Sequence, residues 1–297
     1  MNNRRTTEIL LAFCLIAVAA TGYVLVTALD RLRFELESLH ATVRTLNEKI
    51  SSAPLRTAAS AVPEKPKPEV PMANAQFFDP EAVSGDRFIS SIAADTKNMN
   101  YLLNNDATLG NALMPRVMDS LGVRAYDDLN KFLPQMAESW NVSPDGLRIR
   151  VKLRDGILWH DFTDPVTKKE WKDVPVTSED FKFYVDVVKN PKVDAAPLRT
   201  YLSDLDSVRV INDREFEVIW KKRYFLSLDM TLSLSPLPRH LYHAYEGPFN
   251  PERFNGDNER NRILVGCGPY RFIKWDKGHR ILMTRWEKYY GARYGTM

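Results

Sequence analysis

Two histidines, His240 and His243, have the spacing that comes nearest to a metal site in this sequence. Three residues apart, their imidazoles would lie on one face of a helix, as metal-binding pairs do. A complete site needs further ligands, and no nearby cysteine or third histidine supplies them. The sequence therefore predicts no metal.

His160 is followed directly by Asp161, and such a pair could act as a general base with an orienting carboxylate. Adjacent residues point in different directions in regular structure, so their spacing does not favour this role. Cys267 would need a nearby base to act as a nucleophile, and none is evident, so we expect a buried free thiol. Cys14, the other cysteine, lies far away in an apolar run, and no disulfide is expected.

The remaining catalytic patterns are also missing from the sequence. There is no phosphate-binding loop and no nucleophile elbow, and "GCGPY" at residues 266–270 lacks the third glycine and the helix of a dinucleotide fingerprint. The composition, 44% hydrophobic and 27% charged with a net charge of +3, is that of a globular protein with a core. We predict a protein that is not an enzyme, has no cofactor and binds no nucleic acid.

The predicted secondary structure of the domain is a mixture of strands and helices. Residues 147–154, "LRIRVKLR", alternate apolar and basic side chains and predict a half-buried strand. Its basic stripe could bind phosphate, but a solvated sheet face is the commoner arrangement. Residues 177–190 predict a helix with a capping box formed by Thr177 and Asp180. Its apolar face is expected to consist of Phe181, Tyr184, Val185 and Val188. Hairpins are predicted over 208–220 and 270–286. The domain is therefore α/β or α+β.

An uncharged run, residues 9–29, precedes this domain. As a helix it would span roughly 31 Å, which is enough to cross a bilayer. A cleavable signal peptide is the alternative, although its apolar region is usually only about 7–15 residues long. We predict a transmembrane anchor behind a cytoplasmic flank, residues 1–8. The basic residues on the two sides of the run do not assign its orientation.

A heptad seam follows the apolar run over residues 29–50. Its a and d positions are Leu29, Leu32, Leu36, Leu39, Val43, Leu46 and Ile50. This pattern predicts a parallel two-stranded coiled coil and hence a homodimer, with a single amphipathic helix as the alternative. Residues 51–76 contain five prolines among small residues and predict an extended linker. The folded domain is expected to cover 77–297.

Several ordered motifs in this domain resemble family 5 of the bacterial extracellular solute-binding proteins, the peptide-binding components of ABC importers. They are "LPQMAESWNVSPDGLRIRVKLRDGILWHD" at 133–161, "VPVTSEDF" at 174–181, "PLPRHLY" at 236–242 and "GCGPYRFIKWDKG" at 266–278. The resemblance covers residues 88–291. Two departures are Cys267, where threonine is usual, and a longer loop within 160–177.

The resemblance implies a lobe of the type II periplasmic-binding-protein-like fold, a mixed α+β structure that closes on a ligand without catalysis. It implies a peptide or other small solute as ligand, and an ABC permease with its ATPase as partner. The globular domain would lie on the periplasmic side of the cytoplasmic membrane, attached through residues 9–29. It also places Asp106, Ala107 and Thr108 at one side of the ligand cleft.

Family members continue past the segment that corresponds to "RWEKYYG", residues 285–291, into a second lobe. We therefore expect this chain to be the N-terminal part of a solute-binding protein, with the second lobe absent. The alternative is a coiled-coil interaction or structural protein that displays a degenerate lobe and binds no solute.

Overall fold

The computed structural model describes residues 73, 85, 87–256 and 258–294. The predicted flank 1–8, anchor 9–29 and coiled coil 29–50 lie outside the described residues, as does the linker 51–76 apart from Ala73. The chain divides into two compact units, Met1–Lys65 and Pro66–Met297, and the description below concerns the second. Within its described part, no helix is long and apolar enough to cross a membrane.

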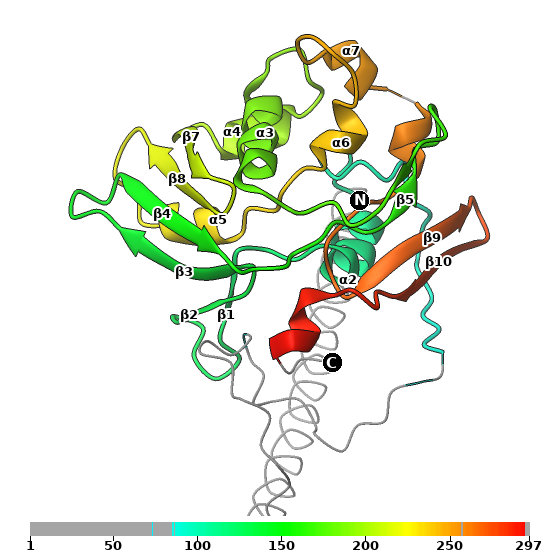
Figure 1. The fold of residues 1–297 in the computed structure, drawn as a ribbon, viewed down its shortest axis with the longest axis horizontal. Helices are drawn as coiled ribbons and strands as arrows, with labels where there is room; N and C mark the ends of the chain where they lie inside the picture. The colour runs from blue at the N-terminus through cyan, green and yellow to red at the C-terminus, as the bar shows by residue number, and fades with distance from the viewer. Residues whose placement is uncertain (1–72, 74–84, 86, 257, 295–297) are drawn as a thin grey trace, which may run out of the picture. The chain divides into compact units, whose positions relative to one another are not determined.

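The centre of this unit is a four-stranded antiparallel sheet with the strand order β3-β4-β8-β7 (Figure 1). Its strands are β3 (Ala137–Val142), β4 (Arg148–Leu153), β7 (Leu205–Asn212) and β8 (Glu215–Trp220). Strand β4 follows the predicted alternation, with Ile149, Val151 and Leu153 buried and the basic residues between them exposed. The left-handed glycines Gly146 and Gly156 flank it in the predicted turns.

The basic stripe of β4 lies opposite carboxylates on the neighbouring strands. Arg150 pairs with Glu215 over 2.9 Å, and Lys152 pairs with Glu138 over 3.1 Å. These cross-strand pairs are exposed, so each contributes little to stability. They fit the prediction of a solvated sheet face.

Helix α3 (Ser178–Lys189) covers the inner face of the sheet and starts with the predicted capping box. The Thr177 amide donates to Asp180 Oδ2 over 2.9 Å. The ring of Phe181 stacks on Phe216 of β8 with centroids 4.9 Å apart. The buried side of α3 is wider than predicted, because Phe183 and Val187 are buried as well.

The other elements are short and surround this layer pair. The strands are β1 (Gly122–Arg124), β2 (Phe132–Pro134), β5 (Phe162–Thr163), β6 (Glu170–Trp171), β9 (Tyr270–Asp276) and β10 (Arg280–Arg285). The helices are η2 (Thr108–Leu113), α2 (Met114–Val117), α4 (Ala196–Tyr201), α5 (Ser227–Leu232), α6 (Arg239–Tyr242), α7 (Pro251–Phe254), η3 (Glu259–Arg262) and η4 (Tyr290–Tyr294). The mixed α/β class predicted from the sequence is confirmed.

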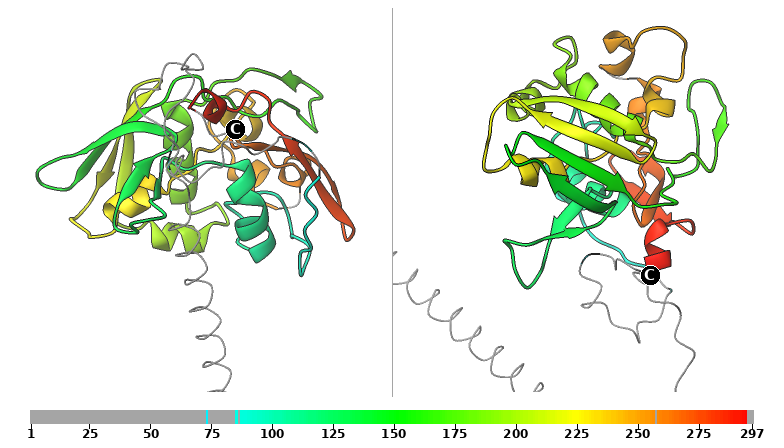
Figure 2. Two further views of the ribbon diagram at one scale, coloured as in Figure 1. Left: turned by 90° about the horizontal axis from the view of Figure 1, so that it is seen from below. Right: turned by 60° about the vertical axis from the view of Figure 1, so that its left-hand side comes forward.

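A second, smaller core lies beside the first, where η2 and α2 pack on the β9–β10 hairpin (Figures 1 and 2). Its buried residues are Met99, Leu109, Leu113, Val117 and Leu264. Element η2, which runs directly into α2, is a π-helix. Pro115, in the first turn of α2, lacks the amide hydrogen that a continuous α-helix would need at this position. Gly278 closes the hairpin with φ +75°, as its turn requires.

Candidate functional site

The predicted ligand-binding residues lie together at the beginning of η2. Asp106 is half-buried, Ala107 is exposed, and Thr108 is buried with 7% of its surface accessible. The structure places Ala107 and Thr108 within the first helical turn. Of these three residues, Ala107 is therefore the most exposed to solvent.

Both carboxylate oxygens of Asp106 are engaged in hydrogen bonds. Oδ1 accepts from the Leu109 amide over 2.8 Å, as an N-cap residue would. Oδ2 accepts from Thr96 Oγ1 (2.9 Å), the Lys97 amide (3.1 Å) and Asn104 Nδ2 (2.7 Å). Partial burial raises the pKa of Asp106, but these hydrogen bonds outweigh it and hold the pKa below its usual value. The carboxylate therefore acts as a positioning group that fixes the segment around Ala107.

The loop before this segment is attached at two further points. Thr108 Oγ1 donates to the Ala94 carbonyl over 2.6 Å. Asp95 accepts from Trp275 Nε1 (2.9 Å) and from the Gly278 amide (2.6 Å) at the tip of the β9–β10 hairpin. Residues 94–108 and the hairpin are consequently held as one assembly.

Sequence analysis missed Asp95, Thr96 and Asn104 as members of this assembly. A signal was present, since residues 95–106 are rich in Asp, Asn and Thr, which bond to nearby main-chain amides in turns. The Asn100 and Asp106 amides, for example, donate to the side chains of Asn98 and Asn104 two residues earlier.

Residues 266–268, "GCG", run directly against the C-terminal end of α2. A Cβ on Gly266 would lie 1.9 Å from the Val117 carbonyl oxygen, and one on Gly268 would lie 2.8 Å from the Val117 carbonyl carbon. The Gly268 amide donates to the same carbonyl oxygen over 2.9 Å. Both positions therefore require glycine because main chain packs on main chain.

His160 holds this loop from the other side. Its Nε2 bonds to the Gly268 carbonyl over 2.9 Å, and its Nδ1 accepts from the Gly266 amide over 3.3 Å. The ring is therefore the neutral tautomer protonated on Nε2. Burial lowers the pKa of His160 to about 4. Asp161 instead accepts from Lys288 over 2.7 Å, so the two residues do not form a catalytic pair.

Cys267 is buried, with 1% of its surface accessible, and is a free thiol as predicted. Its sulfur contacts the sulfurs of Met118 (3.7 Å) and Met136 (3.9 Å). Burial raises the pKa of the Cys267 thiol far above its usual value. A protonated thiol in an apolar setting is a packing residue rather than a nucleophile.

The two histidines of the candidate metal pair have different surroundings. His240 packs among the rings of Trp159, Phe162 and Trp171. Its Nε2 is buried without a hydrogen-bond partner, and burial lowers its pKa to about 4. His243 ends α6 and bonds through Nε2 to the Gly247 carbonyl over 2.9 Å. Within the described residues, no group of three or more His, Cys, Asp or Glu side chains could hold a metal ion.

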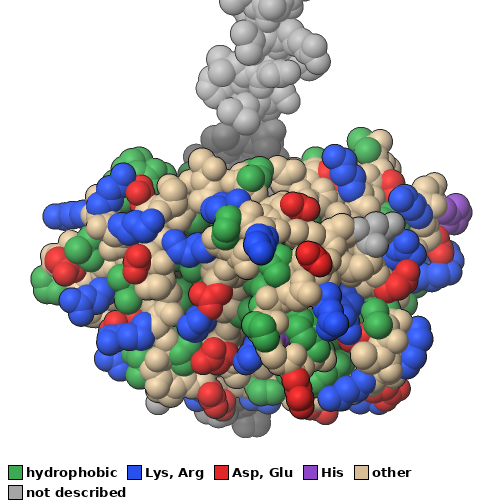
Figure 3. All heavy atoms as spheres, turned by 90° about the horizontal axis from the view of Figure 1, so that it is seen from above, with side chains coloured by type: hydrophobic (Ala, Val, Ile, Leu, Met, Phe, Trp, Pro, Cys, Tyr) green, Lys and Arg blue, Asp and Glu red, His purple; other side chains and the backbone are tan. Residues whose placement is uncertain are grey.

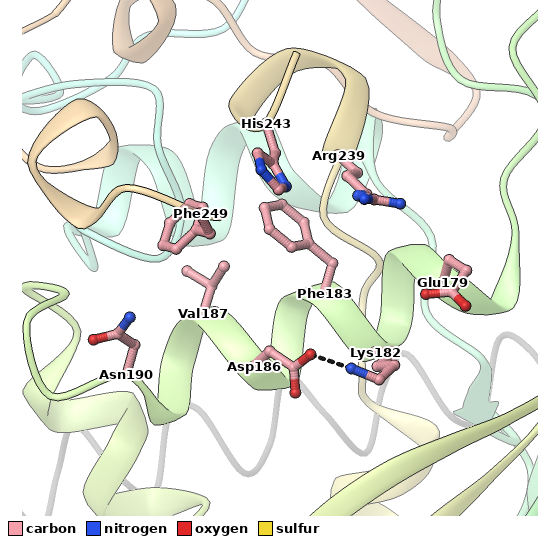
Figure 4. Close-up of a pocket in the computed structure, with 9 residues that line it drawn as sticks. All are labelled: Glu179, Lys182, Phe183, Asp186, Val187, Asn190, Arg239, His243 and Phe249. Carbon is pink, nitrogen blue, oxygen red and sulfur yellow. Dashed lines mark hydrogen bonds and ion pairs between the residues drawn. The ribbon is translucent and has the colours of Figure 1, made fainter. Parts of the chain in front are cut away.

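A cavity of about 290 Å³ lies between α3 and the segment 239–249 (Figure 4). Phe183, Val187 and Phe249 give it an apolar side. Charged and polar groups complete it: Glu179, Lys182, Asp186, Asn190, Arg239 and His243. It shares no residue with the assembly around Asp106.

Comparison with known proteins identifies relatives of this fold. A model of the family described as bacterial extracellular solute-binding proteins, family 5, middle region, matches residues 131–295, more than half of the 297-residue chain. The oligopeptide-binding protein AliB of Streptococcus pneumoniae is 29% identical over 103 residues, which are 35% of this chain and 14% of AliB. The dipeptide-binding protein of Escherichia coli is 26% identical over 196 residues, covering 59% of this chain and 34% of the relative.

Among solved structures, NikZ from Campylobacter jejuni in complex with Ni(L-His) is similar with a TM-score of 0.52 and 27% identity. The match covers 68% of this chain and 35% of NikZ. The chain therefore spans about a third or less of the length of each of these proteins.

Proposed function

Because the chain belongs to family 5 of the bacterial extracellular solute-binding proteins, we propose that it captures a peptide or another small solute for an ABC importer. The observation that carries the proposal is the family match over residues 131–295. The named functions of two relatives, oligopeptide and dipeptide binding, favour a peptide as ligand.

In this proposal the segment Asp106–Thr108 forms one wall of the ligand cleft. Ala107 is exposed, while Asp106 and Thr108 fix the turn through their hydrogen bonds. Since the Asp106 carboxylate is already saturated, Ala107 and the main chain around it would contact the solute. Main-chain contacts suit a ligand whose side chains vary, such as a peptide. A second lobe would supply the opposite wall.

Calorimetry with residues 1–297 and a mixture of di- to pentapeptides tests whether this chain holds only one wall of the cleft. We expect no saturable heat from residues 1–297 alone, and saturable heat once the C-terminal lobe of the E. coli dipeptide-binding protein is fused to the chain. In the fusion, Ala107→Arg should abolish the heat, whereas Asn111→Arg, exposed in the same helix, should preserve it. Saturable heat from the chain alone would contradict the proposal that it holds only one wall of the cleft. An Ala107→Arg fusion that still binds peptide would contradict the proposal that Asp106–Thr108 forms that wall.

We also propose that the folded domain lies outside the cytoplasmic membrane. Relatives of this family are described as extracellular, and a domain attached through residues 9–29 would lie outside the cytoplasmic membrane. The heptad seam over 29–50 would pair two copies. Chemical crosslinking of residues 30–297 should yield a dimer, and a species that stays monomeric argues against the seam as a dimer contact.

A further inference from the structure

The cavity beside α3 has an apolar floor built from two elements. Phe183 and Val187 of α3 are buried, and Phe249 closes the floor from the other side (Figure 4). The rings of Phe183 and Phe249 meet edge to face with centroids 5.5 Å apart. This arrangement leaves room for an apolar group that is shielded from water on two sides.

Two opposite charges at the cavity lack partners. Within the described part of the chain, the exposed side chains of Glu179 and Arg239 form no hydrogen bond and no ion pair, with each other or with any other residue. Lys182 and Asp186, by contrast, pair with each other over 2.5 Å. Glu179 and Arg239 are therefore available for a ligand that carries both a positive and a negative group.

His243 adds one polar atom to this site. Its ring stacks on Phe183 with centroids 5.9 Å apart, and its Nε2 is used by the Gly247 carbonyl. With the proton on Nε2, the Nδ1 atom remains as an acceptor. The charges of the four charged side chains that line the cavity sum to zero. Basic, acidic and apolar side chains are likewise mixed over the face of the molecule shown in Figure 3. A neutral zwitterion fits this balance better than an anion or a cation does.

We infer that this cavity binds a free α-amino acid with an apolar side chain. The carboxylate would pair with Arg239, the ammonium with Glu179, and the side chain would pack on Phe183, Val187 and Phe249. The volume of about 290 Å³ is at the lower end of the roughly 300–1,000 Å³ of small-molecule sites, as expected for a ligand of this size. The site is separate from the wall formed by Asp106–Thr108.

Isothermal titration of the full chain with L-leucine and L-phenylalanine tests the inference. We expect saturable binding at one site, and affinity at least about tenfold lower for N-acetyl-L-leucine and for L-leucine methyl ester, because each lacks one charge. Arg239→Gln and Glu179→Gln should each weaken binding of the free amino acid by a similar factor. The matched controls Arg148→Gln and Glu287→Gln remove exposed charges outside the cavity and should leave the affinity unchanged.

Three results would overturn the inference. They are the absence of saturable binding, equal affinity for the blocked analogues, and unchanged affinity in both cavity variants. Equal affinity for the blocked analogues would indicate an apolar contact, such as one for a side chain of a protein partner. Circular dichroism of each variant confirms that it is folded. Ala107→Arg should not alter amino-acid binding, so this site and the proposed solute cleft can fail independently.

Discussion

The hydroxyl of Tyr290 donates a hydrogen bond to Oδ2 of Asp119 over 2.7 Å. Tyr289 donates to the same oxygen over 2.8 Å. These bonds attach the C-terminal helix η4 and the residue before it to the segment that follows α2, and all three side chains are buried. The segment "RWEKYYG" is thus fastened to the lobe by a buried carboxylate and two phenols.

Tyr290→Phe should lower the free energy of unfolding by about 1–3 kcal/mol at pH 7, because the buried carboxylate loses one of its two tyrosine donors. Urea denaturation followed by circular dichroism measures this. The control Tyr201→Phe removes an exposed hydroxyl and should change stability by less than about 0.5 kcal/mol. Equal effects of the two substitutions would show that the hydrogen bond to Asp119 contributes nothing.

Asp119→Asn should change how stability depends on pH. Burial raises the pKa of Asp119 to about 6, so the folded state binds the proton more tightly than the unfolded chain does. Protonation therefore adds stability as the pH falls from about 6 towards 3.8, by about 3 kcal/mol over the whole window, and this gain is lost above pH 6. His160 titrates in the same window with the opposite sign, so the measurement is a difference: on going from pH 7 to pH 5, the urea midpoint of the variant should change less favourably than that of the parent protein.

His160→Gln should change the same profile with the opposite sign. The folded pKa of about 4 lies below the unfolded value of 6.5, so the contribution of His160 is complete above pH 6.5 and is lost as the pH falls towards 4. By linkage this loss amounts to about 3 kcal/mol over the window. Glutamine can still donate to the Gly268 carbonyl but does not titrate. His279→Gln, at the exposed hairpin tip, is the control and should keep the parent profile.

Gly266→Ala should be among the most destabilising single substitutions in this lobe. Its Cβ would lie 1.9 Å from the Val117 carbonyl oxygen, so main chain has to move, and we expect a loss of more than about 3 kcal/mol or no folded protein. Gly110→Ala is the matched control. It is exposed in η2 with no atom within 4 Å of the new Cβ, and it should be neutral or stabilising by up to about 1 kcal/mol. Thermal melting of both variants compares them.

Asp106→Ala should lower the free energy of unfolding by about 2–3 kcal/mol, because the loop 94–98 and the first turn of η2 lose their shared acceptor. The pKa of Asp106 is lowered on folding, so its contribution is present above about pH 4 and disappears as the pH falls further. Hydrogen exchange should show faster exchange of the Leu109 and Lys97 amides. Asp127→Ala, an exposed aspartate outside this assembly, should leave those amides protected.

Local patterns predicted strand β4, helix α3 and the hairpins β7–β8 and β9–β10, but not the short helices around them. Strand β4 and helix α3 follow from alternation and from the capping box, since both signals act between residues close in sequence. The predicted buried stripe of α3 was too narrow, because α3 also packs against His243 and Phe249 on a second side. Periodicity does not reveal such an additional neighbour.

The candidate site was harder to predict, because its contacts join residues far apart in sequence. The family resemblance pointed to Asp106, yet it could not show that the Asp106 carboxylate already accepts hydrogen bonds from Thr96, Asn104 and Leu109. Similarly, the motif "GCGPY" indicated a hairpin, and only the fold shows that its glycines touch Val117 and that His160 bonds to both. The cavity of α3 had no sequence signal, since its walls come from segments about 60 residues apart.

The contact of Gly266 and Gly268 with Val117 has a mechanical consequence. Neighbouring segments in a protein are usually separated by packed side chains, and such packing already transmits strain. Here the main chain of residues 266–268 lies directly against the main chain at Val117, with no side chain between them. A displacement of this loop, which leads into strand β9, would therefore be passed directly to the C-terminal end of α2.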